Sequence, residues 1–353
     1  MKKVKLKYEF LVTGIYPFDG DYQKGEYVLK KNTIDEKKFE THIKGDILYI
    51  NPIIGYCSYP FNGQNVYLTF EKEVVTEIDI SDYNETEKIS EFINKIDLLK
   101  ESKNLEQMLV LEINNSIIFP IKMLKVYDLD NNYLTMNINF SKLNVPSLIN
   151  FEQTYSMEKI ERQNNRITFG FNYDLLTELK EKNNLFARAL SLYYSSFIAN
   201  DYNIGFILLI TALETLFNRA TYSKVEKCKS CSQLIYEIAS SVSNNVSLIL
   251  MDESETIKKV IKEKYKKRSK YLHGEKVEIT SKEDQELQEY VRKVLLMYWY
   301  IFINIKTNEH KSIIAEFQKQ DYKTKLTYIS FLKVLELKTF DEKKDDILQA
   351  FIK

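Results

Sequence analysis

Glycine, proline, histidine and cysteine are all scarce in this chain of 353 residues, and each shortage excludes something. The 9 Gly and 5 Pro fall well below the roughly 7% and 5% of average proteins, which excludes collagen-like, proline-rich and glycine-rich low-complexity sequences. Neither G-x-G-x-x-G nor G-x-x-x-x-G-K-[ST] occurs, so the common phosphate-cradling loops are absent. With only 3 His and 3 Cys, the chain cannot build several metal sites.

Long hydrophobic runs are also lacking. The two strongest, Ile204–Phe217 and Val294–Ile305, are shorter than the roughly 18–20 residues of a membrane-spanning helix. The first ten residues, MKKVKLKYEF, alternate charged and apolar positions and do not lead into the apolar core of a secretory signal. Because the cysteines are few and odd in number, no disulfide framework is indicated. We therefore expect a cytoplasmic protein that does not contact a membrane.

The first half of the chain has the alternating pattern of β-strands. Hydrophobic residues make up 44% of the chain and charged residues 28%, and this hydrophobic content is enough for packed cores. The length of the chain predicts two domains. Turn signals such as Asn62-Gly63 separate the alternating segments of residues 1–177. We expect strands that include 4–10, 46–50, 66–70, 108–113, 117–121, 134–140 and 166–171. With one helix near Glu85–Leu99, this half is predicted to be an antiparallel β-rich domain with a helical insertion.

From about residue 178 the apolar residues recur with the period of a helix. Ser254 is the expected N-cap of one helix, Gly274 its C-terminal stop, and Ser281 opens the next in what resembles a capping box. We expect helices over 185–199, 203–217, 233–242, 254–272 and 281–305 in a domain of residues 178–307, with a helical extension over 308–353. The predicted fold class is α+β, with a β-rich domain before an α-helical bundle.

The most informative segment is the end of the predicted helix 254–272. Residues 258–270 hold seven lysines, one arginine and one glutamate, a net charge of +7 in a chain whose 50 Lys+Arg balance 50 Asp+Glu. Such a field attracts phosphate polyanions, and salt weakens the attraction. The alternative is a solvated helix face whose lysine stems cover apolar surface. If the field serves RNA, the expected contacts are Lys264, Lys266, Lys267, Lys270 and Tyr271.

Arg268 and His273 lie five residues apart at the end of the same helix. In a continuous helix this spacing rotates two residues by about 140°, so they would not share a face. Gly274 allows the helix to end at His273, which frees the imidazole to turn back. A guanidinium can clamp and neutralise a phosphate, and an imidazole can move a proton near neutral pH. The pair suits phosphodiester cleavage, without a metal if RNA supplies its 2′-hydroxyl; a purely structural pair is the alternative.

These residues also resemble a known family. Arg268-x4-His273, with glycine after the histidine, resembles the R-x(4–6)-H signature of the HEPN superfamily. About fifty residues upstream, the apolar segment Phe206–Phe217 carries Ala-Leu-Glu, the second recurrent mark of that superfamily. Residues 178–307 resemble a HEPN bundle as a whole, and a β-rich domain before the bundle resembles the Apea-like HEPN proteins.

The resemblance implies a metal-independent endoribonuclease that needs no cofactor and acts as a homodimer, with both R-x4-H segments in one composite site. Arg268 would stabilise the phosphorane, His273 would act as general acid and base, and Ser269 would orient either of them. Cleavage would leave a 2′,3′-cyclic phosphate. The superfamily is common in toxin–antitoxin, abortive-infection and phage-defence systems, so a phage-derived trigger or a regulatory protein is a further expected partner. The β-rich domain would sense the trigger, regulate the nuclease or present substrate.

Two alternatives from other functional classes stay open. One is a non-catalytic HEPN module that binds RNA or a protein partner. The other is a nucleotide-modifying system, in which a separate protein would supply a nucleotidyltransferase.

Glu214 stands on an otherwise apolar segment, where an unpaired buried charge is costly. It could hold Arg268 in place as part of the site, or pair with a structural arginine such as Arg188 or Arg219.

The C-x2-C pair Cys228 and Cys231 supplies two zinc ligands where a structural site needs four. A packed thiol pair is favoured, a zinc site shared across a dimer is the alternative, and no metal is expected.

The remaining candidate residues point less clearly to a chemical role. His42 and His310 have charged sequence neighbours and are expected at the surface. The segment Tyr298–Tyr300 invites base stacking, but its apolar helix favours packing in the core or a dimer interface. The aromatic-rich loop Tyr56–Asn65 is a candidate ligand-sensing surface.

Overall fold

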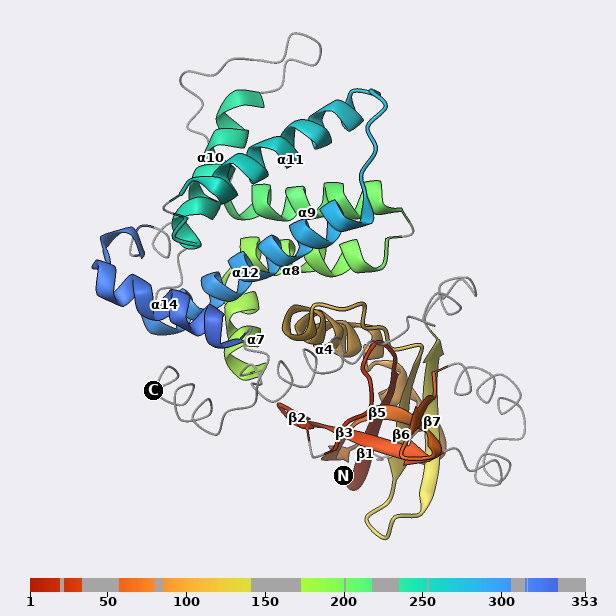
Figure 1. The fold of residues 1–353 in the computed structure, drawn as a ribbon. Coiled ribbons are helices and arrows are strands. Elements are labelled where there is room, and N and C mark those ends of the chain that lie inside the picture. The colour runs from red at the N-terminus through yellow and green to blue at the C-terminus, as the bar shows by residue number, and fades with distance from the viewer. Residues whose placement is uncertain are drawn as a thin grey trace. The chain divides into compact units, whose positions relative to one another are not determined.

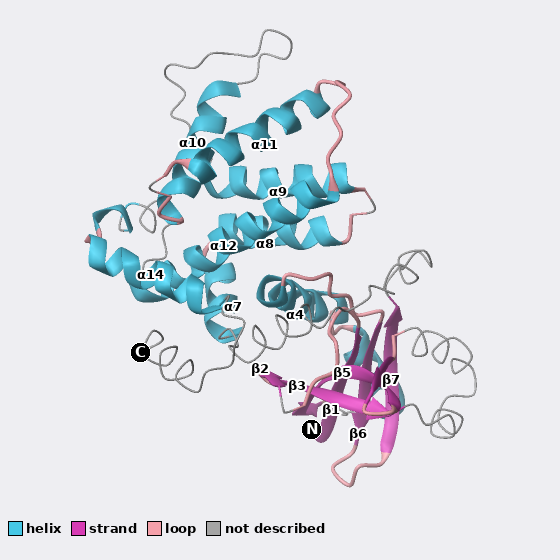
Figure 2. Ribbon diagram, in the orientation of Figure 1, coloured by secondary structure: helices cyan, strands magenta, loops and turns pink. Residues whose placement is uncertain are grey.

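A computed structural model describes residues 1–19, 22–33, 57–79, 85–140, 173–199, 201–217, 235–252, 254–305, 315 and 317–335. The chain divides into two compact units, one of residues 1–110 and 115–173, the other of residues 111–114 and 174–353. The first unit contains an antiparallel sheet and the second contains helices (Figures 1 and 2). The fold class is therefore α+β, as the sequence predicts.

The sheet of the first unit is antiparallel throughout its described strands. Its order is β2-β3-β5-β1-β6-β7, and β4 pairs with β5. The strands are β1 (Lys2–Val12), β2 (Tyr22–Lys24), β3 (Tyr27–Thr33), β4 (Tyr59–Phe61), β5 (Gln64–Ile78), β6 (Ile121–Tyr127) and β7 (Tyr133–Phe140). β4 and β5 meet through Asn62 and Gly63, whose φ angles of 49° and 78° are those of a tight hairpin turn. The predicted strands 4–10, 66–70 and 134–140 are confirmed.

An aromatic cluster forms the centre of this unit. The Phe10 ring stacks on Tyr27 and on Phe119, with centroids 5.6 and 5.5 Å apart, and Phe70 lies 6.0 Å from Phe119. All four side chains are at most 1% exposed. Phe10 of β1 and Phe70 of β5 lie opposite each other in the sheet, so burial of the face that carries them fixes the register of these two strands.

Two expectations for the first unit are wrong. The segment 108–113, predicted as a strand, is the end of helix α4 (Leu98–Ile113), which follows α3 (Glu85–Asn94). Every residue from Leu105 to Ile113 is buried, and a short, mostly apolar run does not distinguish a buried helix from a buried strand. The segment 117–121 makes only an isolated bridge between Ile118 and Thr13 before β6 begins. Pro120 explains the interruption, because proline cannot donate to a sheet ladder.

Gly14 offers a stability test in this unit. Its φ is +86°, and a Cβ there would lie 1.9 Å from the carbonyl oxygen of Ser116. Gly14→Ala should therefore cost at least about 3 kcal/mol in urea unfolding, from both strain and overlap. Gly63→Ala is the matched control, because φ is +78° but no atom lies within 4 Å, and it should cost only about 1 kcal/mol. Equal losses in the two variants would contradict the crowding at Gly14.

The second unit is helical throughout its described elements. These are α7 (Tyr173–Lys182, whose first residue belongs to the first unit), α8 (Asn184–Phe197), α9 (Tyr202–Phe217), α10 (Ile235–Ile249), α11 (Thr256–Leu272), α12 (Ser281–Ile305) and α14 (Tyr322–Leu335). Helix α9 contacts α8, α10, α11 and α12 (Figure 1). Its mostly apolar sequence agrees with this central position, because a helix that is apolar all round belongs in a core. Tyr298–Tyr300 are at most 2% exposed, so they pack in the core, as expected.

The caps of α11 differ from prediction at one end. The backbone N–H groups of Thr256 and Lys258 donate to the Asp252 carboxylate, each at 3.1 Å, and the Ser254 hydroxyl donates to the same carboxylate. Ser254 as N-cap is therefore wrong, since Asp252 reaches the exposed amides with two oxygens. At the other end, His273 is the C-cap and Gly274 follows with a φ of +80°, which confirms the predicted stop.

Helix α12 begins at Ser281, as predicted, but its capping box starts one residue earlier. The Glu283 N–H donates to Thr280 Oγ1 at 3.3 Å, and the Thr280 N–H donates to Glu283 Oε2 at 3.1 Å. The box is therefore Thr280-x-x-Glu283. Within the described ranges, no helix has the length and apolar character needed to cross a bilayer.

Candidate functional site

Arg268 is held against α9 by Glu214. Its Nη2 lies 3.0 Å from Glu214 Oε2, and the two side chains are only 17% and 14% exposed. The partner of Glu214 is thus Arg268, and not Arg188; Arg219 lies outside the described residues. An ion pair this sheltered from water fixes the guanidinium more firmly than a surface pair would.

Tyr265 is the residue of this cluster that sequence reasoning missed. Its hydroxyl donates to Glu214 Oε1 at 2.5 Å and accepts a long contact of 3.4 Å from Arg268 Nη1. The guanidinium carbon lies 5.5 Å from the centre of the Tyr265 ring. Burial, and then the hydrogen bond to Glu214, raise the pKa of Tyr265. The signal in the sequence was a tyrosine one helical turn before Arg268, on the apolar stripe that faces α9.

This cluster leaves part of the guanidinium without a partner. Arg268 Nε is buried and has no hydrogen-bond acceptor among the described residues. An Arg side chain presents five N–H donors, and Glu214 and Tyr265 together use only some of them. The arrangement therefore presents a positioned cation with remaining donor capacity.

His273 follows Arg268 by five residues at the exposed end of α11. Its backbone N–H donates to the carbonyl oxygens of Ser269 and Lys270, each at 3.1 Å, which closes the last turn. The Ser269 hydroxyl makes no hydrogen bond within the described part of the chain, so the predicted contact with Arg268 or His273 is not seen there. Arg268 thus points to α9, whereas His273 lies at the solvent-exposed C-cap.

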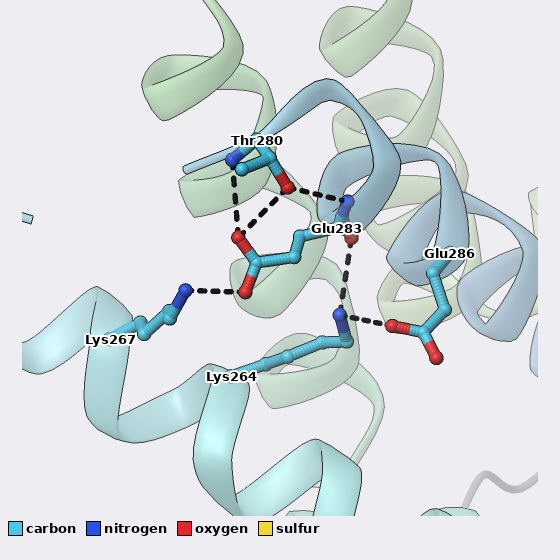
Figure 3. A network of polar contacts seen from close by, with 5 residues as sticks. All are labelled: Lys264, Lys267, Thr280, Glu283 and Glu286. Carbon is cyan, nitrogen blue, oxygen red and sulfur yellow. Dashed lines mark hydrogen bonds and ion pairs between the residues drawn. The ribbon is translucent and has the colours of Figure 1, made fainter. Parts of the chain in front are cut away.

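Two of the predicted RNA-binding lysines are engaged by α12 (Figure 3). Lys264 is 5% exposed; its Nζ lies 2.6 Å from Glu286 Oε2 and donates to the Glu283 carbonyl at 3.2 Å. Lys267 pairs with the Glu283 carboxylate, and this hydrogen bond, with those from Thr280, lowers the pKa of Glu283 to about 2. Both ammonium groups are therefore neutralised locally, and the Lys264 side chain is not at the surface.

The other predicted RNA contacts, Lys266, Lys270 and Tyr271, are better placed to meet a ligand. Lys266 is exposed and has no ion pair among the described residues, and Lys270 is exposed with Glu275 at 3.6 Å. Tyr271 lines an open pocket of about 830 Å³ at the end of α11. The pocket is also lined by Asn203, Gly274 and residues 275–279.

Several sequence candidates lie outside the described residues: His42, His310, Cys228 and Cys231. No group of three His, Cys, Asp or Glu side chains that could hold a metal ion occurs in the parts of the chain that the structure describes. The described part of the loop 56–65 begins at the buried Cys57 and continues into the β4–β5 hairpin.

A buried carboxyl group beside this site gives a test of pH dependence. Asp284 is 3% exposed, packs against Gly205 and lies near Lys264, and burial raises its pKa to about 6. Because the pKa is higher in the folded state than in the unfolded state, protonated Asp284 makes its whole contribution to stability below about pH 4. That contribution is lost as the pH rises through about 6. Asp284→Asn should therefore raise stability by roughly 1–3 kcal/mol at pH 7.5 and hardly at all at pH 4.

The measurement is thermal unfolding by calorimetry at both pH values. A gain of the same size at pH 4 and pH 7.5, or a loss at pH 7.5, would show that the Asp284 carboxylate is not destabilising.

Comparison with known proteins yields no matching family model, no matching curated protein and no matching solved structure.

Proposed function

We propose that the chain is an endoribonuclease of the HEPN type, with Arg268 and His273 as its reacting side chains. The observation that carries this proposal is the placement of the two residues at one helix end. Arg268 is fixed by Glu214 and Tyr265, and the exposed His273 follows at the C-cap of the most basic helix.

The chemistry needs no group beyond RNA and the protein. The 2′-oxygen of a ribose attacks the adjacent phosphorus as the bond from phosphorus to the 5′-oxygen breaks. An imidazole takes the 2′-hydroxyl proton, and an imidazolium gives a proton to the leaving 5′-oxygen. Arg268 stabilises the charge that gathers on the phosphorane oxygens. The products are a 2′,3′-cyclic phosphate and a 5′-hydroxyl.

The proposal includes a homodimer. One chain supplies a single R-x4-H segment, whereas the reaction uses one imidazole as base and one as acid. Two copies that meet at their α11 ends bring both imidazoles to one phosphate. In this scheme the nuclease acts in phage defence or abortive infection, and the β-rich domain receives the trigger or regulatory protein.

The direct test is cleavage of RNA by the purified chain in EDTA, beside expression in cells. We expect fragments that are absent with the Arg268→Ala/His273→Ala variant, and RNA loss with growth arrest that the same variant relieves. If neither purified RNA nor cellular RNA is cut in a manner that depends on these two residues, the proposal is wrong.

One observation favours a second candidate, a non-catalytic module that binds RNA. The Arg268 charge is already compensated by Glu214, as it would be in a purely structural pair. This candidate predicts salt-sensitive RNA binding without cleavage, and little phenotype for His273→Ala.

A further inference from the structure

Four lysines form a row along one side of α11. Lys259, Lys262, Lys266 and Lys270 follow one another at intervals of three or four residues, so they lie within an arc of about 80° on the helix surface. Lys259, Lys266 and Lys270 are exposed, and Lys262 is half-buried. The row is about 17 Å long, and His273 continues it one turn further on.

The row carries most of the uncompensated charge of this helix. Lys264 and Lys267, on other sides of α11, have carboxylate partners in α12. Within the described ranges, no ion pair involves Lys259, Lys262 or Lys266. Lys270 has Glu275 at 3.6 Å, but both side chains are more than half exposed, so that pair contributes little. The acidic side chains beside the row are the exposed Glu263 and the exposed N-cap residue Glu255, whose carboxylate pairs with Lys258 and interacts at longer range with Lys259 and Lys262.

We propose that this lysine row binds the phosphate backbone of single-stranded RNA and leads the strand to His273. This inference rests on the proposed function and identifies its substrate path. Of the lysines predicted from the sequence to contact RNA, the row keeps Lys266 and Lys270. Lys259 and Lys262 take the place of Lys264 and Lys267.

The surroundings of the row favour RNA over an anionic membrane. Ile261 and Tyr265, on the apolar stripe of α11, are buried at 0% and 4% exposure, and Leu272 at the end of the helix is 53% exposed. A single exposed leucine is less than the free apolar face that a membrane-surface helix needs. At the His273 end, the open pocket of about 830 Å³ has room for a base, and Tyr271 offers it a ring. The two carboxylates Glu275 and Glu278 in the same pocket outnumber its one ammonium group, Lys276, and disfavour a phosphate there, so the backbone belongs on the row and a base in the pocket.

The experiment measures binding of a labelled single-stranded RNA of 20 nucleotides to the His273→Ala chain, which leaves the RNA intact, across a series of NaCl concentrations. Adding Lys259→Gln and Lys262→Gln should reduce the slope of log K against log salt by about 1.4, since each phosphate contact contributes about 0.7 for a single strand. Affinity at low salt should fall about tenfold or more. Glu263→Gln should have the opposite effect and tighten binding several-fold.

The matched control is Lys103→Gln with Lys323→Gln, which removes two exposed helical lysines outside α11 and should leave the slope unchanged. Circular dichroism should be the same for all variants, because none of the replaced side chains is fully buried.

The outcomes separate this inference from the proposed function. In one outcome, the slope is unchanged in the Lys259→Gln/Lys262→Gln variant while the otherwise unaltered chain cleaves RNA. That result overturns RNA binding by the row and leaves the proposed nuclease activity intact. Row-dependent RNA binding by a chain that cuts no RNA supports the row and overturns the nuclease. Row-dependent binding to vesicles of phosphatidylserine and phosphatidylcholine, without RNA binding, overturns the row as an RNA surface.

Discussion

His273→Ala should lower the rate of RNA cleavage by about 10³-fold or more while leaving RNA affinity nearly unchanged. The expected loss is that of a general acid or base, roughly 10²–10⁴-fold, and in a dimer both imidazoles are lost together. The fold should not suffer, because the bonds that end α11 come from the backbone N–H of His273 and from Gly274. The measurement is single-turnover cleavage in EDTA with the variant in excess over a labelled RNA.

The chain provides its own control for this variant, since it has only 3 His. His42→Ala and His310→Ala remove the other two and should cleave at the normal rate. A His273→Ala chain that keeps its rate, or a similar loss in all three variants, would remove His273 from the chemistry.

Glu214→Ala should reduce both stability and cleavage. It leaves the Arg268 guanidinium, only 17% exposed, without its carboxylate, and breaking such a pair should cost about 2–4 kcal/mol of unfolding free energy. We also expect cleavage to fall about 100-fold, because the guanidinium is no longer held on the α9 side of α11. Urea unfolding and single-turnover cleavage measure the two losses separately.

Arg268→Ala in the Glu214→Ala background distinguishes a structural pair from a functional one. With both charges removed, most of the lost stability should return, whereas cleavage should not recover and should fall further. Tyr265→Phe should have an intermediate effect on both, since it keeps the ring against Arg268 but loses the hydrogen bond to Glu214. If cleavage returned together with stability, Arg268 would be structural only.

The sequence predicts the long, strongly periodic elements of this chain well. The alternation of β1, the start of α12 at Ser281 and the stop of α11 at Gly274 all agree with the structure. Each of these depends on local chemistry, either a hydrophobic period or a residue suited to a positive φ. The end of helix α4 is assigned wrongly, because it is buried on every side and its short, mostly apolar sequence does not distinguish a helix from a strand.

At the candidate site too, the sequence predicts what depends on local chemistry and not what depends on packing between helices. The proximity of Glu214 and Arg268 was one of three alternatives in the sequence, and packing of α9 against α11 decides among them. The neutralisation of Lys264 and Lys267 could not be foreseen, since the start of α12, with Glu283 and Glu286, meets these lysines only in the folded chain. A count of charges along α11 alone therefore overstates its positive field. The carboxylates of α12 neutralise one side of α11 and leave the field on the side that has no such partners.

The most direct test of the proposed chemistry is cleavage of an RNA that carries a single 2′-deoxy nucleotide at a mapped cleavage site, in EDTA. The account predicts that cleavage stops at that position alone, that other sites are cut at their normal rates, and that the fragments from those sites end in 2′,3′-cyclic phosphate and begin with a 5′-hydroxyl. Normal cleavage at the deoxy position, or fragments with 5′-phosphate ends, would contradict attack by the 2′-hydroxyl and with it the proposed roles of Arg268 and His273.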